Sequence, residues 1–396
     1  MIVPTIDPFR RIVWPLAIAQ IFMWASMYYL FPALLLEWER DLGWSKTELS
    51  GAFTMALVVS AALAPAVGRI IDRGFGSRIF TGSAVLGSLL LALLSMVTKL
   101  WQFYTVWILI GMAMSGGLYE ACFAILTRVM GTRAKQAITL VTLVAGFAGT
   151  LAFPGTHALV GIFGWRGTVL SFATAIILIA TPLIWSGCRF SERHAETHAV
   201  IASHEATETL GVFRSARFWL LAVAYTTIAL DHGLLLTHLL PLLDDRGIQS
   251  EAAVLAASML GPMQVAGRLA IIAAGQRVST LGIFIFAYIS MVIAALSLLG
   301  SGTVPVFIVS FILFQGAGFG VMSIMRPVMV AELFGRNNFG LISGSLAVPY
   351  LGAAAAAPTI AAIIWWVSGY DLVILFAIGA SGIGLVSLLA AATIST

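Results

Sequence analysis

Charged residues are scarce in this sequence. Asp, Glu, Lys and Arg make up 10% of the 396 residues, whereas hydrophobic residues make up 60% and the mean hydropathy is +1.01. A soluble chain usually carries about 25% charged residues. Water is therefore excluded as the main solvent, and a lipid bilayer is expected. The net charge of +4 comes from basic residues spread singly over short loops, which indicates membrane topology and no nucleic-acid partner.

Signatures of soluble enzymes and disulfide-rich proteins are also missing. The two cysteines, Cys122 and Cys188, lie in different segments, so neither a disulfide framework nor a metal site is predicted. The sequence has no Gly-Lys-Ser/Thr phosphate loop, no His-Glu-x-x-His and no Gly-x-Ser-x-Gly. We expect no enzyme activity, no cofactor and no metal. The first apolar run has no cleavage signature after it and is interpreted as a spanning helix.

Long apolar runs dominate the chain. About 20 helical residues cross the roughly 30 Å of hydrocarbon in a bilayer. Twelve such runs are predicted, near 13–35, 49–68, 79–98, 101–126, 137–161, 166–187, 216–240, 251–274, 278–299, 303–329, 339–365 and 371–393. The fold class is an all-α membrane protein with twelve transmembrane helices in two pseudo-symmetric six-helix halves. The expected divisions are 1–187, a cytoplasmic linker at 188–215, and 216–396.

The distribution of basic residues predicts the topology. Fourteen of the 21 Lys and Arg residues fall in segments on the side of the N-terminus, and five fall on the opposite side; Arg268 and Arg326 lie inside predicted spans. Because cytoplasmic loops are enriched in Lys and Arg, both termini are predicted to be cytoplasmic.

The two halves show traces of a repeat. A shift of 204 residues places Gly43 on Gly247, Gly131 on Gly335 and Pro154 on Pro358, and a shift of 199 places Gly68-Arg69 on Gly267-Arg268. Such a pattern is expected when two six-helix halves derive from one unit.

One short turn carries a resemblance to a known family. The stretch Gly68-Arg-Ile-Ile-Asp72-Arg73-Gly-Phe-Gly-Ser-Arg78 resembles the loop signature of the major facilitator superfamily. The resemblance implies that Asp72 and Arg73 pair with neighbouring helix ends and latch one conformation. The alternative interpretation is an ordinary basic turn on the cytoplasmic side.

Three further stretches resemble the bacterial monocarboxylate-transporter-like branch of that superfamily: Gly43-Trp-Ser-Lys-Thr-Glu-Leu-Ser, Gly261-Pro-Met-Gln-Val-Ala-Gly-Arg268 and Phe334-Gly-Arg-Asn-Asn-Phe-Gly340. This resemblance implies that Arg268 binds a substrate carboxylate. Better-known members place an Asp one turn before that Arg, where this sequence has Gln264. Arg268 and Gln264 share a helix face and are predicted to bind substrate. The alternative for Arg268 is an anchor at the membrane interface.

Charged and titratable residues inside predicted spans are the other candidates, because a charge at mid-bilayer costs roughly 2.5 to 3.5 kcal/mol. Asp231 or His232 is predicted to carry a coupling proton, with a structural salt bridge from Asp231 to Arg268 as the alternative. Glu120 is a third proton candidate. It is otherwise expected to pair with Arg128 or Arg326, which join Asp72 and Arg73 in the predicted latch.

Aromatic residues in the first span complete the candidate site. Tyr28 and Tyr29, together with Trp24, are predicted to line a central cavity, because a tyrosine offers an apolar body with a polar tip. Interfacial or core packing is the alternative interpretation of the same residues.

These observations predict a secondary active transporter of a small organic solute, with an organic anion such as a monocarboxylate favoured and a proton as candidate coupling ion, working by alternating access. Proton-coupled efflux of drugs or toxic compounds is one alternative, and a non-transporting membrane receptor or scaffold is another. We expect a monomer, multi-pass in the cell inner (plasma) membrane.

Overall fold

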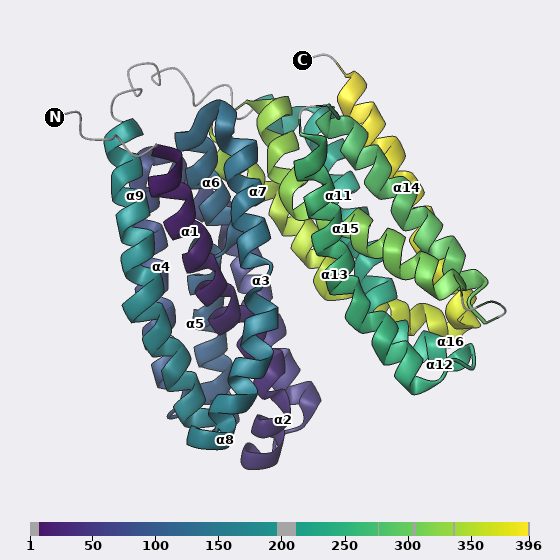
Figure 1. Ribbon diagram of the computed structural model, residues 1–396, viewed down its shortest axis with the longest axis horizontal. Helices are drawn as coiled ribbons and strands as arrows, with labels where there is room; N and C mark the ends of the chain where they lie inside the picture. Colours follow the sequence, from purple (N-terminus) through teal and green to yellow (C-terminus); the bar gives the residue numbers. More distant parts are fainter. Residues whose placement is uncertain are drawn as a thin grey trace. The chain divides into compact units, whose positions relative to one another are not determined.

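The computed structural model describes residues 8–195, 211–275, 277–302, 304, 306–335 and 337–394. Within these ranges the chain is helical and contains no strand (Figure 1). Residues 196–210 of the predicted linker at 188–215 lie outside the described residues. Arg336, counted above among the basic residues on the side of the N-terminus, also lies outside them.

The chain forms two compact units. Unit 1 comprises the described residues within 1–204 and 335–347, and unit 2 comprises those within 205–334 and 348–396. The helices of unit 1 are α1 (Pro8–Trp24), η1 (Ala25–Tyr29), α2 (Leu30–Leu42), α3 (Lys46–Ile70), η2 (Ile71–Phe75), α4 (Gly76–Leu94), α5 (Leu100–Gly117), α6 (Tyr119–Met130), η3 (Gly131–Arg133), α7 (Ala134–Ala145), α8 (Ala148–Ala175), η4 (Ile176–Ala180) and α9 (Thr181–Ala195).

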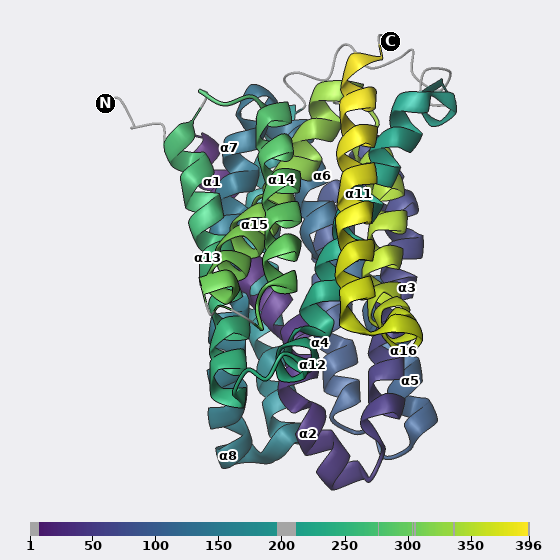
Figure 2. The ribbon, with the colours of Figure 1, turned by 90° about the vertical axis from the view of Figure 1, so that its right-hand side faces the viewer.

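Unit 2 is built from α11 (Ala216–Thr237), α12 (Leu239–Asp245), α13 (Ser250–Ala274), α14 (Thr280–Leu299), α15 (Val306–Phe334) and α16 (Phe339–Thr393). The first turns of α16 pack within unit 1, and the rest of that helix belongs to unit 2. Figure 2 shows α13, α14 and α15 close together, and α15 packs against both of the others.

Eight helical runs among the described residues are long and apolar enough to cross a membrane. The 47-residue run Glu48–Leu94 and the 55-residue run Phe339–Thr393 each divide in two, at Gly74 and at Ser368–Gly369, where the backbone is not helical. The 91-residue run Leu100–Phe190 divides into three segments, near 131–133 and at Gly164, and shorter breaks at Leu118 and at Gly146–Phe147 lie within these segments. With five single runs, the described residues contain the twelve segments that were predicted.

Local sequence explains where helices stop and start. Gly43 ends α2 with a positive φ of 71°, a conformation that costs glycine little. Ser45 then caps α3: its hydroxyl accepts from the Glu48 amide N–H, and the Glu48 carboxylate accepts from the Ser45 N–H. This capping box satisfies orphan donors of the first turn.

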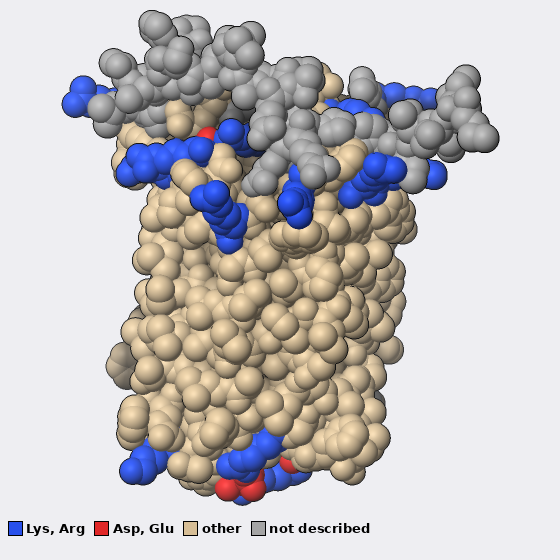
Figure 3. Space-filling model, turned by 90° about the vertical axis from the view of Figure 1, so that its left-hand side faces the viewer, with Lys and Arg blue, Asp and Glu red and all other residues tan. Residues whose placement is uncertain are grey.

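The exterior matches an apolar solvent. Figure 3 shows one face on which Lys and Arg gather at two ends, with a broad band between them that carries neither basic nor acidic residues. Large apolar side chains such as Leu178, Ile179 and Leu89 are exposed on the surface. Exposed apolar surface on this scale fits a lipid environment, where every backbone polar group must be satisfied inside a helix.

Candidate functional site

Unit 1 holds a contact between α3 and the first turns of α16 that involves the motif residue Asp72. The two Asp72 carboxylate oxygens accept hydrogen bonds from the backbone N–H groups of Gly340 and Leu341, at 2.9 and 2.8 Å. The first N–H groups of a helix have no partner within that helix, and the helix dipole favours an anion there. Asp72 therefore caps α16 from another helix.

Glycines allow this contact to form. A Cβ added to Gly68 would lie 1.9 Å from the Gly340 carbonyl oxygen, and one added to Gly344 would lie 2.4 Å from the carbonyl oxygen of Ala64. The backbones of α3 and α16 thus touch directly, a mode of packing that small residues permit in membrane proteins. Asp72 lies one turn beyond Gly68, where the same approach brings it to the helix start.

Arg128, at the end of α6, holds the other side of the Asp72 turn. Its guanidinium donates to the carbonyl oxygen of Ile71 at 3.2 Å and also to that of Asp72. Arg128 therefore satisfies carbonyl groups of η2, directly after α3. Arg73, the second motif residue, is exposed.

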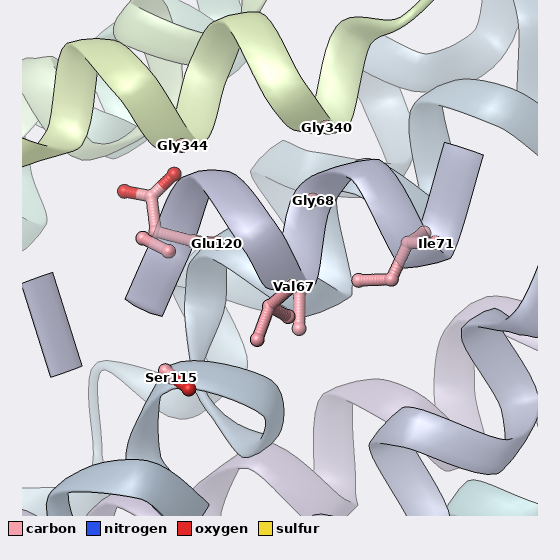
Figure 4. A pocket seen from close by; sticks show the side chains of 9 residues that line it. Val67, Gly68, Ile71, Ser115, Glu120, Gly340 and Gly344 are labelled. Atoms are coloured by element: carbon pink, nitrogen blue, oxygen red, sulfur yellow. The ribbon is translucent and has the colours of Figure 1, made fainter. Parts of the chain in front are cut away.

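Glu120 faces the same contact from α6. The Ser343 hydroxyl donates to the Glu120 carboxylate at 3.2 Å, and Figure 4 shows that carboxylate pointing toward α16 near Gly344. Glu120, Val67, Ser115 and Gly340 help to line a crevice with too little free space to admit a water molecule. Glu120, predicted from the sequence as a proton site, is thus gathered at one contact with Asp72 and Arg128, two residues of the predicted latch.

An aromatic cluster surrounds the π-helix η1. Trp24 lies against Tyr28, Tyr29 and Tyr119, with ring centroids 5.2, 6.4 and 4.7 Å apart, and Tyr29 contacts Phe153 at 6.2 Å. Both predicted tyrosines are half-buried. A π-helix turn is rare and is found often at functional sites, so the cluster is a candidate contact surface for an apolar part of a substrate.

In unit 2, Asp231 and His232 of α11 share one partner. The side-chain nitrogen of Gln315, on α15, lies 3.3 Å from the Asp231 carboxylate and 3.3 Å from Nδ1 of His232. All three side chains are buried, and the His232 ring stacks on Phe319 with 3.4 Å between centroids. The alternative salt bridge between Asp231 and Arg268 is not formed: Asp231 has no ion pair with any described residue.

Arg268 is half-buried on α13 and reaches α15, where its Nε donates to the Gly320 carbonyl oxygen at 3.0 Å. α13 and α15 approach closely here because Gly320 has no side chain: an added Cβ would lie 2.4 Å from the carbonyl oxygen of Gln264. Gln264 is also half-buried. Arg326, on α15, lies over the Tyr350 ring, 3.6 Å from its centroid. The predicted pairing of Glu120 with Arg326 stays a prediction.

The sequence analysis did not predict roles for Gln315 or Ser343. They are uncharged, and their contacts join helices far apart in the chain: 84 residues separate Gln315 from Asp231, and 223 separate Ser343 from Glu120. One signal was available for Gln315, because an amide in a long apolar helix needs a hydrogen-bond partner.

Twelve apolar segments with a few buried polar clusters define a multi-pass membrane protein. Residues 16–348 match the family model described as Major Facilitator Superfamily, and the chain belongs to this superfamily. Membership points to a transporter rather than an enzyme. No curated protein sequence gives a significant match.

Solved structures share the fold at low sequence identity. The E. coli fucose:proton symporter FucP has a TM-score of 0.71 and 12% identity, covering 99% of this chain and 99% of that chain. The human organic anion transporter MFSD10 (TETRAN) has a TM-score of 0.71 and 15% identity, covering 97% and 100%. A bacterial homologue of the iron transporter ferroportin, in an outward-facing state, has a TM-score of 0.73 and 14% identity, covering 97% and 100%.

Proposed function

We propose that this chain is a secondary transporter of a small organic anion, with monocarboxylates as the leading class and a proton as the coupling ion, working by alternating access. The observation that carries the proposal is Arg268, a half-buried guanidinium held on the backbone of α15. The proposal includes a monomer in the cell inner membrane with both termini cytoplasmic.

Physical chemistry favours an anion at this position. A cation at membrane depth is costly unless it has a partner or a wet cavity. A guanidinium can grip a carboxylate through two parallel hydrogen bonds, which an ammonium group cannot do. Gln264, one turn earlier, adds an amide donor on the same face. A structural neighbour named as a human organic anion transporter supports the proposal through its similar fold.

The contact between α3 and α16 supports a latch. Asp72 caps the first turns of α16, and the glycines bring the two backbones together. We assign the latch to Asp72, Arg128 and Glu120, with Arg73 and Arg326 as outlying members. Separation of α16 from α3 would expose the Asp72 carboxylate and the N–H groups of Gly340 and Leu341 together, so the step is costly unless water enters.

The test is uptake of labelled monocarboxylates into proteoliposomes. Arg268→Ala should lower the initial rate about tenfold or more, since a hydrogen bond to a charged group is worth about 1.5 to 3 kcal/mol and 1.4 kcal/mol is a factor of ten. Arg268→Lys should recover only part, because the bidentate geometry is lost. Arg277→Ala, at an exposed arginine beyond α13, is the matched control. Unchanged uptake in Arg268→Ala would remove the anion site.

Export of apolar or aromatic compounds is the second candidate, favoured by the cluster of Trp24, Tyr28, Tyr29 and Tyr119. It predicts that cells expressing the protein resist such compounds and that Tyr28→Ala reduces the resistance. Monocarboxylate uptake without any resistance would reject this candidate.

A further inference from the structure

The core of unit 2 contains a carboxyl group without a cation. Asp231 has no exposed surface and lies among α11, α14, α15 and α16. The titratable groups that face it are His232 on its own helix and Tyr288 on α14. α14 has no charged residue. On α15, Arg326 comes eleven residues after Gln315, about 16 Å along a helix.

The Gln315 amide accounts for one side of the site. Its NH₂ group offers two hydrogens, and it lies 3.3 Å from both the Asp231 carboxylate and Nδ1 of His232. The opposite amide orientation would set its oxygen against an acceptor carboxylate, so the donor orientation is favoured. Nδ1 of His232 then accepts, which makes this ring neutral with its proton on Nε2. His232 is thereby not the cation that Asp231 lacks.

The other side of the site is incomplete. Oδ1 of Asp231 and the Ser381 hydroxyl are both buried, and neither has a hydrogen bond of normal geometry with a described residue, although the hydroxyl lies close enough to interact with this carboxyl group. Ser381, on α16, faces the same carboxyl group. An ionised carboxylate here would be a buried charge with no cation beside it and only neutral donors such as the Gln315 amide for compensation, and burial of a charge without an ion partner costs several kcal/mol. A proton on Oδ1 removes that charge and supplies a donor directed at Ser381.

We propose that Asp231, Gln315 and Ser381 form an occluded proton-binding site, in which Asp231 is a neutral acid that donates from Oδ1 to the Ser381 hydroxyl while Gln315 holds Oδ2. One proton binds from water and returns to water. The site deepens the proposed function, on which its coupling role rests, because it selects Asp231 over His232 and Glu120 as the coupling group. Gln315 and Ser381 are positioning residues.

Infrared difference spectroscopy of the purified protein in lipid tests the site without any substrate. At neutral pH, the wild type should show a protonated-carboxyl band that Asp231→Asn abolishes. Ser381→Ala should move this band to higher frequency, because the acid O–H loses its acceptor. Asp244→Asn, at an exposed carboxyl of α12, should leave it unchanged. If Asp231→Asn does not fold, the Ser381→Ala shift still decides the assignment. The absence of the band, or an unshifted band in Ser381→Ala, would overturn the proposal.

Proton uptake driven by solute in proteoliposomes tests the coupling role. Asp231→Asn should retain solute binding and lose proton uptake. A protein that transports solute with undiminished proton uptake in this variant would refute coupling through Asp231. Failure of every solute to be transported would instead refute the proposed function, and the infrared result would remain valid for the site.

Discussion

Each unit has an ion pair across a corresponding turn, but the acidic and the basic partner exchange places between the two units. In unit 1, Asp41 at the end of α2 accepts from Arg166 at 2.8 Å and from the indole N–H of Trp165 at 2.6 Å. In unit 2, 205 residues further on, Arg246 donates to Asp371, which follows Tyr370. Gly164 and Gly369, also 205 apart, have positive φ values of 66° and 75°. The backbone geometry of the turn is shared, whereas the polarity of the ion pair is not.

A second pair of aligned segments differs more strongly. The turn after α3 carries Asp72, which caps α16, whereas the 199-residue shift that aligns Gly68 with Gly267 places buried Ile271 opposite Asp72. Both aligned glycines lie against the backbone of another helix, Gly68 against Gly340 and Gly267 against Ala317, but only Gly68 is followed by a polar group that makes a helix cap. Of the two aligned segments, only the one in unit 1 caps another helix.

The shared close contacts give the largest expected effect. A Cβ on Gly111 of α5 would lie 2.3 Å from the Ala56 carbonyl oxygen, and one on Gly316 of α15 would lie 2.4 Å from the Met263 side chain. Gly111→Ala and Gly316→Ala should each destabilise the protein by about 1 to 3 kcal/mol through overpacking, measured as a lower Tm. Gly261→Ala, with nothing within 4 Å, is the control and should not lower it. Tolerance in one unit only would break the equivalence.

The cap on α16 gives the next effect. Asp72→Asn keeps the shape but removes the charge and one acceptor, so the contact should weaken by about 1.4 kcal/mol, a factor of ten. Alkylation of a cysteine placed at buried Ser343 measures this opening and should become about ten times faster. Asp244→Asn should not change the rate. Equal rates in both variants would show that Asp72 does not hold the contact.

Exchange of the ion-pair charges gives a smaller effect. In unit 1 the Trp165 indole needs an acceptor, so Asp41→Arg with Arg166→Asp should lower stability by up to about 1 kcal/mol even though the pair is retained. In unit 2, Arg246→Asp with Asp371→Arg should be close to neutral. Thermal unfolding of the two double variants gives the comparison, and equal losses would mean that Trp165 does not fix the polarity.

Acid should produce the smallest effect. The hydrogen bond from Trp165, followed by that from Arg166, lowers the pKa of Asp41 below 3.8. Because the folded pKa lies below the unfolded value, the stabilisation is complete above pH 3.8 and is lost as the pH falls through the folded pKa. Asp41 is half exposed, so the contribution is only a few tenths of a kcal/mol. The Tm difference between wild type and Asp41→Asn should shrink toward zero as the pH falls from 3.8 through the folded pKa of Asp41. A difference that does not change with pH would contradict a stabilising role of the ionised Asp41.

The fold class was predictable because apolar length is a local property. Each run of about 20 apolar residues is visible without its neighbours, and the all-helical superfamily fold is confirmed. The breaks at Gly164 and at Ser368–Gly369 fall in the gaps between predicted segments, at 162–165 and 366–370.

Contacts between helices were beyond the sequence. His238 is one example: α11 ends at Thr237, and the His238 ring contacts the carbonyl oxygen of Pro358, 120 residues away. The motif directed attention to Asp72, yet the identity of its partners depends on how closely Gly68 and Gly340 approach. Neutral residues such as Gln315 become informative only when the helix that faces them is known.

The π-helix η1 also has a consequence for helix phase. A π turn accommodates one more residue than an α turn while the axis advances little, so α2 is rotated by about 100° relative to a continuous α-helix starting at Pro8. If the undeleted sequence wound uniformly as an α-helix, Phe31, Leu34 and Trp38 would turn away from the interior they now fill, whereas deletion of one residue such as Ser26 would remove the bulge and keep them facing it. The one additional residue of the π turn thus determines which face of α2 (Leu30–Leu42) points toward the interior.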